Sequence, residues 1–299
     1  MLASGRHIGC LVIGLLLLAS CSQWNVRKDV PVGIGITLDE GCDSTSIQNT
    51  VASVKELNAD VLLVEIPFQV EELQSFENAS DFKYYESHPL EYLLEMLKED
   101  SISYQLSFVL ENPQRKSTDQ VNLGDYFSEI SGILLRSNAY KPFRISFYGE
   151  FFQDDESILA LNKFVQQVRE AIPSVQGNIY YGVQAELLDE TFEWEVPDGI
   201  SLVYVPGSFE GKAKHYYELN KRVGELAVAK EKPLMILRTN LLGDRKYKEF
   251  LLQLSYWPEE VRLEGINLNT LYCETAFLDE ESPFALAKEF SLKRYLQNR

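Results

Sequence analysis

Histidine and cysteine, the residues that most often build metal and thiol sites, are scarce in this sequence. Its 299 residues include three histidines, His7, His88 and His215, and four cysteines. None has the close spacing of zinc ligands, so no structural zinc ion or other metal is predicted. The sequence also lacks a GxSxG nucleophile elbow, and no spaced glycines follow its first β-like run. Serine-hydrolase and dinucleotide sites are therefore not expected, and no cofactor is predicted.

Basic residues are also few relative to acidic ones. The chain has 28 lysines and arginines against 45 aspartates and glutamates, a formal net charge of −17. Phosphate backbones repel such a surface, so the composition disfavours a nucleic-acid partner. Solubility alone accounts for the acidity.

The N-terminal segment has the composition of a leader peptide. Arg6 precedes an apolar run, Ile8 to Leu18, that is too short to span a bilayer. The run ends in the tetrapeptide LASC, which resembles the lipobox of bacterial lipoproteins, where the leader is removed and the cysteine is lipidated. We therefore expect a lipid at Cys21 that attaches the protein to a membrane of the bacterial envelope. The residue after this cysteine is Ser22 rather than an aspartate, which by resemblance to known lipoproteins favours the outer membrane.

The rest of the chain reads as one domain. Residues 1–20 are the expected signal peptide, 21–30 a tether and 31–299 the folded domain, and no later stretch is apolar enough to cross a membrane. Apolar runs typical of buried parallel strands occur eight times, at Val32–Leu38, Val61–Pro67, Ser103–Leu110, Phe143–Tyr148, Asn178–Val183, Ile200–Val205, Leu234–Arg238 and Gly265–Leu271.

Helical periodicity separates most of these runs. Apolar residues recur at helical spacing between them, including one set at Ile47, Val51 and Val54, whereas the fifth connection, Ala185–Pro197, is short and acidic and is expected to hold no full helix. Eight alternations in this length predict a single (β/α)₈ barrel, which typically has about 250 residues. A doubly wound open sheet is the alternative, and the missing glycine-rich loop disfavours it.

Carboxylates follow most of the predicted strands. In a barrel the residues at the strand C-termini meet at one mouth. The polar residues at these positions are Asp39, Glu40, Glu65, Glu111, Asn112, Glu150, Gln184, Glu186, Tyr204, Arg238, Asn240 and Glu274. A chain this acidic has acidic loops anyway, so position alone does not make any one of them functional.

The segment around Glu150 carries a family resemblance. The run FYGEFFQDDESILALNKFVQQVREAIPSVQGNIYYGV resembles the fourth-strand to fifth-strand segment of clan A glycoside hydrolases, closest to the mannanase-like family 113. PDGISLVYVP, KPLMILRTN and LEGINLNTLYCE resemble that family's sixth, seventh and eighth strands. The resemblance covers roughly Pro31 to Arg299 and implies a barrel that binds or hydrolyses a glycan.

The resemblance places Glu150 at the family's acid/base position but departs at the nucleophile. Retaining hydrolysis needs a second carboxylate about 5 to 5.5 Å away. The family supplies it from the end of the seventh strand, where this sequence has Arg238. A guanidinium cannot attack an anomeric carbon, and it is expected to pair with Glu150. The alternative is an inverting pair of Glu150 and Glu274, whose carboxyl groups would lie about 6.5 to 9.5 Å apart.

Other residues at the mouth are candidates for ligand binding. Those predicted to bind substrate are Glu65, Tyr148, Glu186, Tyr204, Arg238, Asn240 and Tyr272. Aromatic rings pack against sugar faces, although many of the aromatic residues near strand ends should belong to the core. The acidic run from Gln153 to Glu156 could ligate a metal, but it is better read as the cap of the following helix.

Two cysteines remain once the leader is removed and Cys21 is lipidated. Cys42 follows the first strand and Cys273 the eighth, and barrel closure makes these strands neighbours. In an oxidising envelope compartment we expect a disulfide between them; the alternative is two separate buried thiols.

Three functions are consistent with these patterns. The first is a lipid-anchored, catalytically degenerate barrel that binds a glycan or an envelope protein. The second is an active glycosidase on a β-linked glycan with Glu150 as general acid. The third is a structural envelope lipoprotein that uses the barrel as a scaffold.

Overall fold

The computed structural model describes the barrel strands and the helices that follow five of them. The described residues are 30–38, 42, 44–56, 59–69, 89–111, 123–137, 142, 144–149, 152, 154–204, 213–238, 257 and 260–272. Among the helices of these ranges, none has the length and apolarity needed to cross a membrane.

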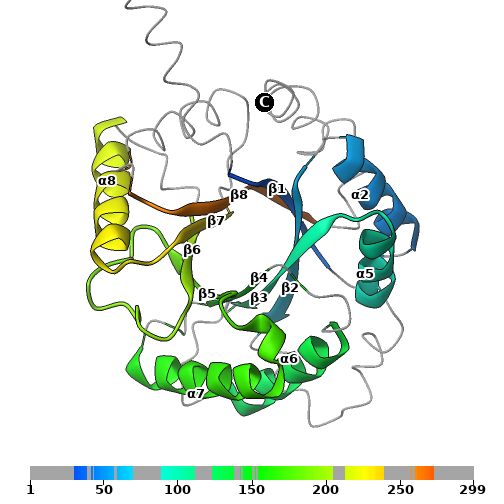
Figure 1. The fold of residues 1–299 in the computed structure, drawn as a ribbon, viewed down its shortest axis with the longest axis horizontal. Helices are drawn as coiled ribbons and strands as arrows, with labels where there is room; N and C mark the ends of the chain where they lie inside the picture. The colour runs from blue at the N-terminus through cyan, green and yellow to red at the C-terminus, as the bar shows by residue number, and fades with distance from the viewer. Residues whose placement is uncertain are drawn as a thin grey trace, which may run out of the picture.

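Eight parallel strands form a closed barrel in sequence order (Figure 1). The first and last strands pair with each other, Val32 opposite Ile266 and Thr37 opposite Tyr272, so the sheet has no free edge. The strands are β1 (Val32–Thr37), β2 (Val61–Gln69), β3 (Ser103–Glu111), β4 (Arg144–Gly149), β5 (Ile179–Gln184), β6 (Gly199–Val203), β7 (Leu234–Arg238) and β8 (Leu263–Tyr272). All eight predicted strands are confirmed.

The described helices lie outside the barrel (Figure 1). They are α2 (Ser44–Glu56), α5 (Pro89–Glu99), α6 (Leu123–Ser137), α7 (Asp155–Ala171) and α8 (Ala213–Ala229). The connection from β5 to β6 consists of turns and bends without a helix, as its short acidic sequence predicts. The chain is therefore a single (β/α)₈ barrel.

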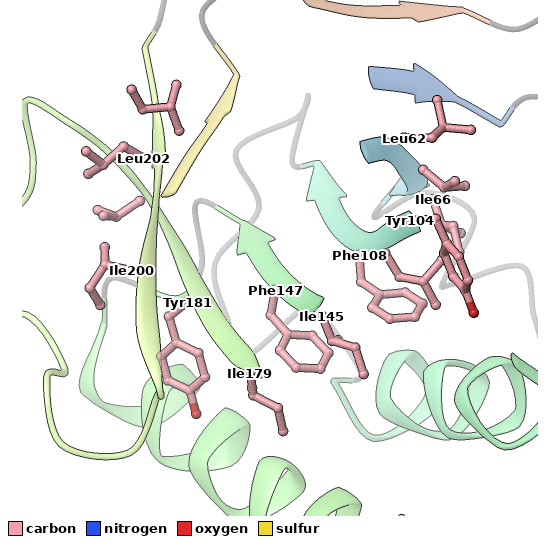
Figure 2. Packing of buried hydrophobic residues seen from close by; sticks show 14 of the residues in the cluster. Leu62, Ile66, Tyr104, Phe108, Ile145, Phe147, Ile179, Tyr181, Ile200 and Leu202 are labelled. Atoms are coloured by element: carbon pink, nitrogen blue, oxygen red, sulfur yellow. The ribbon is translucent and has the colours of Figure 1, made fainter. Parts of the chain in front are cut away.

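Apolar residues on the outer face of the strands pack against the helices. Leu62, Ile66, Phe108 and Phe147 belong to this layer, in which the rings of Phe108 and Phe147 are stacked with centroids 5.7 Å apart (Figure 2). Side chains alternate between the two faces of a strand, so the neighbours of these residues in the sequence point into the barrel. The wide outer layer holds the helices in place around the strands.

The barrel interior combines a small apolar cluster with many polar groups. Leu63, Tyr180, Val203, Met235 and Leu237 form the apolar cluster, and Tyr148 packs against it. Eight further inward positions hold polar side chains that are at most 6 % exposed: Thr37, Glu65, Gln105, Ser107, Arg144, Ser146, Ser201 and Asn267. Bulky branched residues usually fill this space, so a polar interior needs internal hydrogen-bond partners.

An ionic network joins three strands at the N-terminal end of the barrel. Arg144 of β4 donates to the backbone oxygen of Glu264 on β8 at 2.8 Å and to its carboxylate at 3.0 Å, and the Tyr180 hydroxyl of β5 donates to the same carboxylate. Burial alone raises the pKa of Glu264, but hydrogen bonds from Tyr180 and Arg262 and the charge of Arg144 outweigh it and leave that pKa below its usual value. The network is far from the mouth, so we assign it to stability.

Helix α7 begins with a side-chain cap. Asp154 is in the extended conformation and accepts a hydrogen bond from the backbone nitrogen of Ser157 at 2.9 Å. Asp155 and Glu156 follow in the first turn, where negative charge is favourable. This confirms the prediction that the acidic run caps the helix, and the cap fixes where the chain enters α7 after β4.

Candidate functional site

A buried ion pair joins β7 to β2 near the C-terminal end of the barrel. Arg238 is the last residue of β7, and its Nε donates to Oε1 of Glu65 at 2.7 Å while its Nη2 donates to Oε2 at 2.5 Å. The Glu65 side chain is fully buried and that of Arg238 is 19 % exposed. Two parallel charge-assisted hydrogen bonds fix the guanidinium plane against the carboxylate.

A third donor reaches the same carboxylate from β1. The Thr37 hydroxyl donates to Oε2 of Glu65 at 3.3 Å. Thr37 and Glu65 are direct partners in the register of β1 and β2. Glu65 thus accepts hydrogen bonds from two other strands, and both of its oxygens are engaged.

Partly exposed side chains mark the C-terminal ends of three strands that are otherwise buried. They are Tyr148 on β4, Gln184 on β5 and Arg238 on β7. The C-termini of parallel strands lie on one side of a barrel, so these three residues lie at its C-terminal mouth. Together they present an aromatic ring, an amide and a guanidinium, groups that stack on and hydrogen-bond to polar ligands.

The neighbouring strand β5 holds the Tyr148 ring in position. A Cβ atom at Gly182 would lie 2.7 Å from the Cβ and 3.1 Å from the Cδ2 of Tyr148, so only glycine leaves room for this side chain. The amide nitrogen of Gln184 lies 3.5 Å from the Tyr148 hydroxyl, at the outer limit of a hydrogen bond. Gly182 and Gln184 therefore support the base and the tip of the same ring.

The sequence predicts that Glu65, Tyr148 and Arg238 lie at this end of the barrel, where the structure has them, but it does not predict the ion pair of Arg238 with Glu65. It predicts that Arg238 pairs with Glu150, which lies outside the described residues, so that pairing stays a prediction. The sequence also gave no role to Thr37 or Gly182, although Thr37 is an inward-facing polar residue at the end of an apolar strand.

Two predicted ligand-binding residues lie elsewhere. Tyr204 is fully buried in the outer layer, and its hydroxyl donates to Oδ1 of Asn220 on α8 at 2.7 Å. Burial, together with the charge of Glu186, raises the pKa of Tyr204. Glu186 lies beside it, in the connection after β5, and its backbone oxygen accepts a hydrogen bond from Arg222 of α8. Tyr204 therefore faces the helix layer, and the backbone of Glu186 is bonded to that layer.

The carboxylate of Glu186 is unusual in that environment. Neither of its oxygens is accessible, and neither has a hydrogen-bond partner among the described residues. No group of three or more histidine, cysteine, aspartate or glutamate side chains that could hold a metal ion occurs in the described part of the chain.

The remaining predicted site residues stay predictions. Glu150, Glu274 and Asn240 lie outside the described residues, as do Cys21 and Cys273. Tyr272 ends β8, but its side chain is not described. Cys42 is buried and disulfide-bonded. Its pairing with Cys273 remains a prediction.

Among the described residues at this end of the barrel, Glu65 and Arg238 do not offer an accessible nucleophile. Glu65 is inaccessible and has both oxygens engaged, and Arg238 is a cation at the end of β7. Neither can attack an electrophilic carbon. Tyr148 and Gln184 can stack against a ring and donate or accept hydrogen bonds.

The fold and this site define the class of the protein as a (β/α)₈ barrel with a polar mouth. No family model and no curated protein matches the chain. Among solved structures, one described as a GH113 β-1,4-mannanase has a TM-score of 0.63 at 12 % identity, covering 89 % of this chain and 99 % of that chain. A second mannanase structure, described as a complex, has a TM-score of 0.62 at the same identity.

A tryptophan synthase α-subunit from Pyrococcus furiosus is also similar. Its TM-score is 0.54 at 14 % identity, and the match covers 90 % of this chain and 98 % of that chain. The two kinds of enzyme have different names but share this architecture. At such low identities the likeness shows the barrel fold, and a (β/α)₈ barrel supports many chemistries.

Proposed function

We propose that this protein is a glycan-binding barrel of the bacterial envelope that has lost retaining glycosidase activity. The observation that carries the proposal is the ion pair of Arg238 with Glu65 at the end of β7. In the family that the sequence resembles, this position supplies the nucleophile.

The ion pair is incompatible with double displacement at that position. A retaining enzyme needs a nucleophilic carboxylate whose carboxyl group lies about 5 to 5.5 Å from that of the acid/base residue. Arg238 is not a nucleophile, and Glu65 is fully buried beneath it with both oxygens accepting hydrogen bonds. A ligand that enters the mouth therefore meets a guanidinium where an attacking carboxylate would be needed.

Binding is supported by the other side of the mouth. Tyr148 and Gln184 are partly exposed at the ends of strands whose other residues are buried. An aromatic ring and an amide are a suitable pair for a sugar, because the ring covers the apolar face and the amide bonds to hydroxyl groups. The fold likeness to structures described as β-1,4-mannanases is consistent with this assignment.

The leader and lipobox resemblance support the proposed location. In this proposal Cys21 carries the lipid that holds the barrel on an envelope membrane, with the outer membrane favoured, and the mouth binds a glycan there. Cys21→Ser should release the protein from the membrane fraction without changing glycan binding. Retention of that variant on the membrane would contradict the anchor.

Catalysis is tested by comparing the purified protein with its Glu150→Gln variant. Both are incubated with β-mannan, β-glucan and peptidoglycan fragments, and the release of reducing ends is measured. We expect no turnover from either protein. Turnover by the wild type that the Glu150→Gln substitution abolishes would contradict the proposal and favour an active glycosidase.

Binding is tested with the same ligands by affinity electrophoresis and calorimetry. We expect binding without turnover, weakened roughly threefold to tenfold in Tyr148→Ala, because a ring contact contributes about 0.5 to 1.5 kcal/mol. Tyr217→Ala is the matched control, since Tyr217 is 41 % exposed on α8. Failure to bind any of the glycans, or equal weakening in both variants, would refute the proposed site.

A further inference from the structure

The hydroxyl of Ser107 is buried inside the barrel without a protein partner. Ser107 lies on β3 between Leu106 and Phe108, which belong to the outer layer, so its side chain points inward. It is 0 % exposed, and its Oγ has no hydrogen-bond partner among the described residues. A buried hydroxyl left in this state destabilises the fold, and native proteins usually satisfy it.

Polar side chains flank Ser107 on the two adjacent strands. In the strand register Ser107 is opposite Glu65 of β2 and opposite Ser146 of β4. Both neighbouring side chains are also inward and at most 1 % exposed. Ser146 in turn donates to the hydroxyl of Ser201 on β6 at 2.9 Å. Four strands thus contribute polar atoms to one part of the interior.

The hydrogen bonds described so far do not use every donor and acceptor of these serine hydroxyls and of the Glu65 carboxylate. Each serine hydroxyl has one proton and two lone pairs. Ser146 gives its proton to Ser201, but the protons of Ser107 and Ser201 still need acceptors. A carboxylate has about four acceptor sites, and Arg238 and Thr37 fill three of those on Glu65. Serines at three inward positions also occupy less volume than the branched residues that are usual there.

We propose that an ordered water molecule is bound at Ser107, inside the barrel and beneath the Glu65–Arg238 ion pair. It accepts the Ser107 proton and donates to Glu65 and to the Ser146 hydroxyl. These contacts supply the two to four polar partners that a buried water requires. The water joins the ion pair at the mouth to the paired serines below it and solvates a carboxylate that has no access to bulk solvent.

A crystal structure of the full-length or leader-free protein at a resolution that shows ordered solvent tests the site directly. We expect a density peak within hydrogen-bond distance of Ser107 Oγ and of at least one of Glu65 and Ser146. The same peak should be absent or displaced in Ser107→Ala. An interior with no density beside Ser107 would overturn the proposal.

The sign of a stability change gives a second test. If water engages the hydroxyl, Ser107→Ala removes a hydrogen bond and should lower Tm by about 2 to 4 °C. Ser137→Ala is the matched control, because Ser137 is a buried serine outside the proposed site whose hydroxyl donates to the backbone oxygen of Leu134 at 3.2 Å, and its Tm should fall similarly. If the hydroxyl is unsatisfied, Ser107→Ala removes an unfavourable group, and an unchanged or higher Tm would overturn the proposal.

Discussion

Replacing Arg238 with methionine should destabilise the protein more than most single substitutions. Methionine keeps much of the aliphatic volume but removes both charge-assisted hydrogen bonds to Glu65. The carboxylate then remains fully buried with Thr37 as its only donor among the contacts described above. Breaking a buried ion pair from one side costs about 3 to 5 kcal/mol, because an uncompensated charge stays in the interior.

Replacing Glu65 should lower the free energy of unfolding less than replacing Arg238 does. In Glu65→Leu the guanidinium loses its partner, but the Arg238 side chain is 19 % exposed and can turn toward solvent. The double variant leaves no buried charge at this site. It should therefore be more stable than Arg238→Met alone, which gives the cycle a favourable coupling energy of about 1 to 3 kcal/mol.

Urea unfolding with the disulfide intact measures the free energy of unfolding of the wild type, the two single variants and the double variant. The expected loss for Arg238→Met corresponds to a fall in Tm of roughly 6 to 20 °C. Arg262→Met is the control, since Arg262 pairs with Glu264 at 2.6 Å but its side chain is 68 % exposed, and an exposed pair contributes less than about 1 kcal/mol. The reasoning would be refuted if Arg238→Met destabilised the protein no more than Arg262→Met does. It would also be refuted if the double variant were less stable than both single variants.

Three further substitutions test separate parts of the barrel. The folded-state pKa of Glu264 is lowered, so its contribution to stability is present above its unfolded pKa of about 4.3 and is lost as pH falls through the folded value. The Tm of the wild type should therefore fall more steeply below about pH 4.3 than the Tm of Glu264→Gln, and parallel curves would contradict this. Gly182→Ala should cost about 1 to 3 kcal/mol and weaken glycan binding by displacing Tyr148, whereas Gly132→Ala, whose nearest contact would be 3.7 Å away in helix α6, should be neutral or stabilising in the same thermal scans. Asp154→Ala should lower the free energy of unfolding by about 0.5 to 2 kcal/mol through loss of the α7 cap, and an unchanged urea midpoint would show that the cap contributes nothing.

The strands could be predicted because parallel strands covered on both faces are continuous apolar runs. Leu234–Arg238 is predicted to the residue, and the other strands differ by at most two residues at either end. The same property hides which residues point inward. Tyr204 lies within such a run, and its apolar neighbours do not show that it faces α8. The sequence therefore does not reveal that Tyr204 is buried against the helix layer, where the structure has it.

The ion pair could not be predicted, because its partners are on strands far apart in the sequence and not adjacent in the barrel. The family resemblance implies that Arg238 stands where a carboxylate is expected, but it does not reveal which acid Arg238 meets. That depends on the tilt of the strands and on the length of the arginine side chain. Gly182 is hidden for a similar reason, since its role depends on the ring of a residue on the next strand.

Closure of the barrel by the pairing of β1 with β8 also constrains the order of folding. Val32 finds its partner only when Ile266 is available, close to the end of the described chain. Until then β1 has one unpaired edge, and so does β7, and exposed parallel edges pair readily with other chains. Long-range closure of this kind slows folding. A chain truncated before residue 263 should therefore aggregate even though seven of its strands are intact.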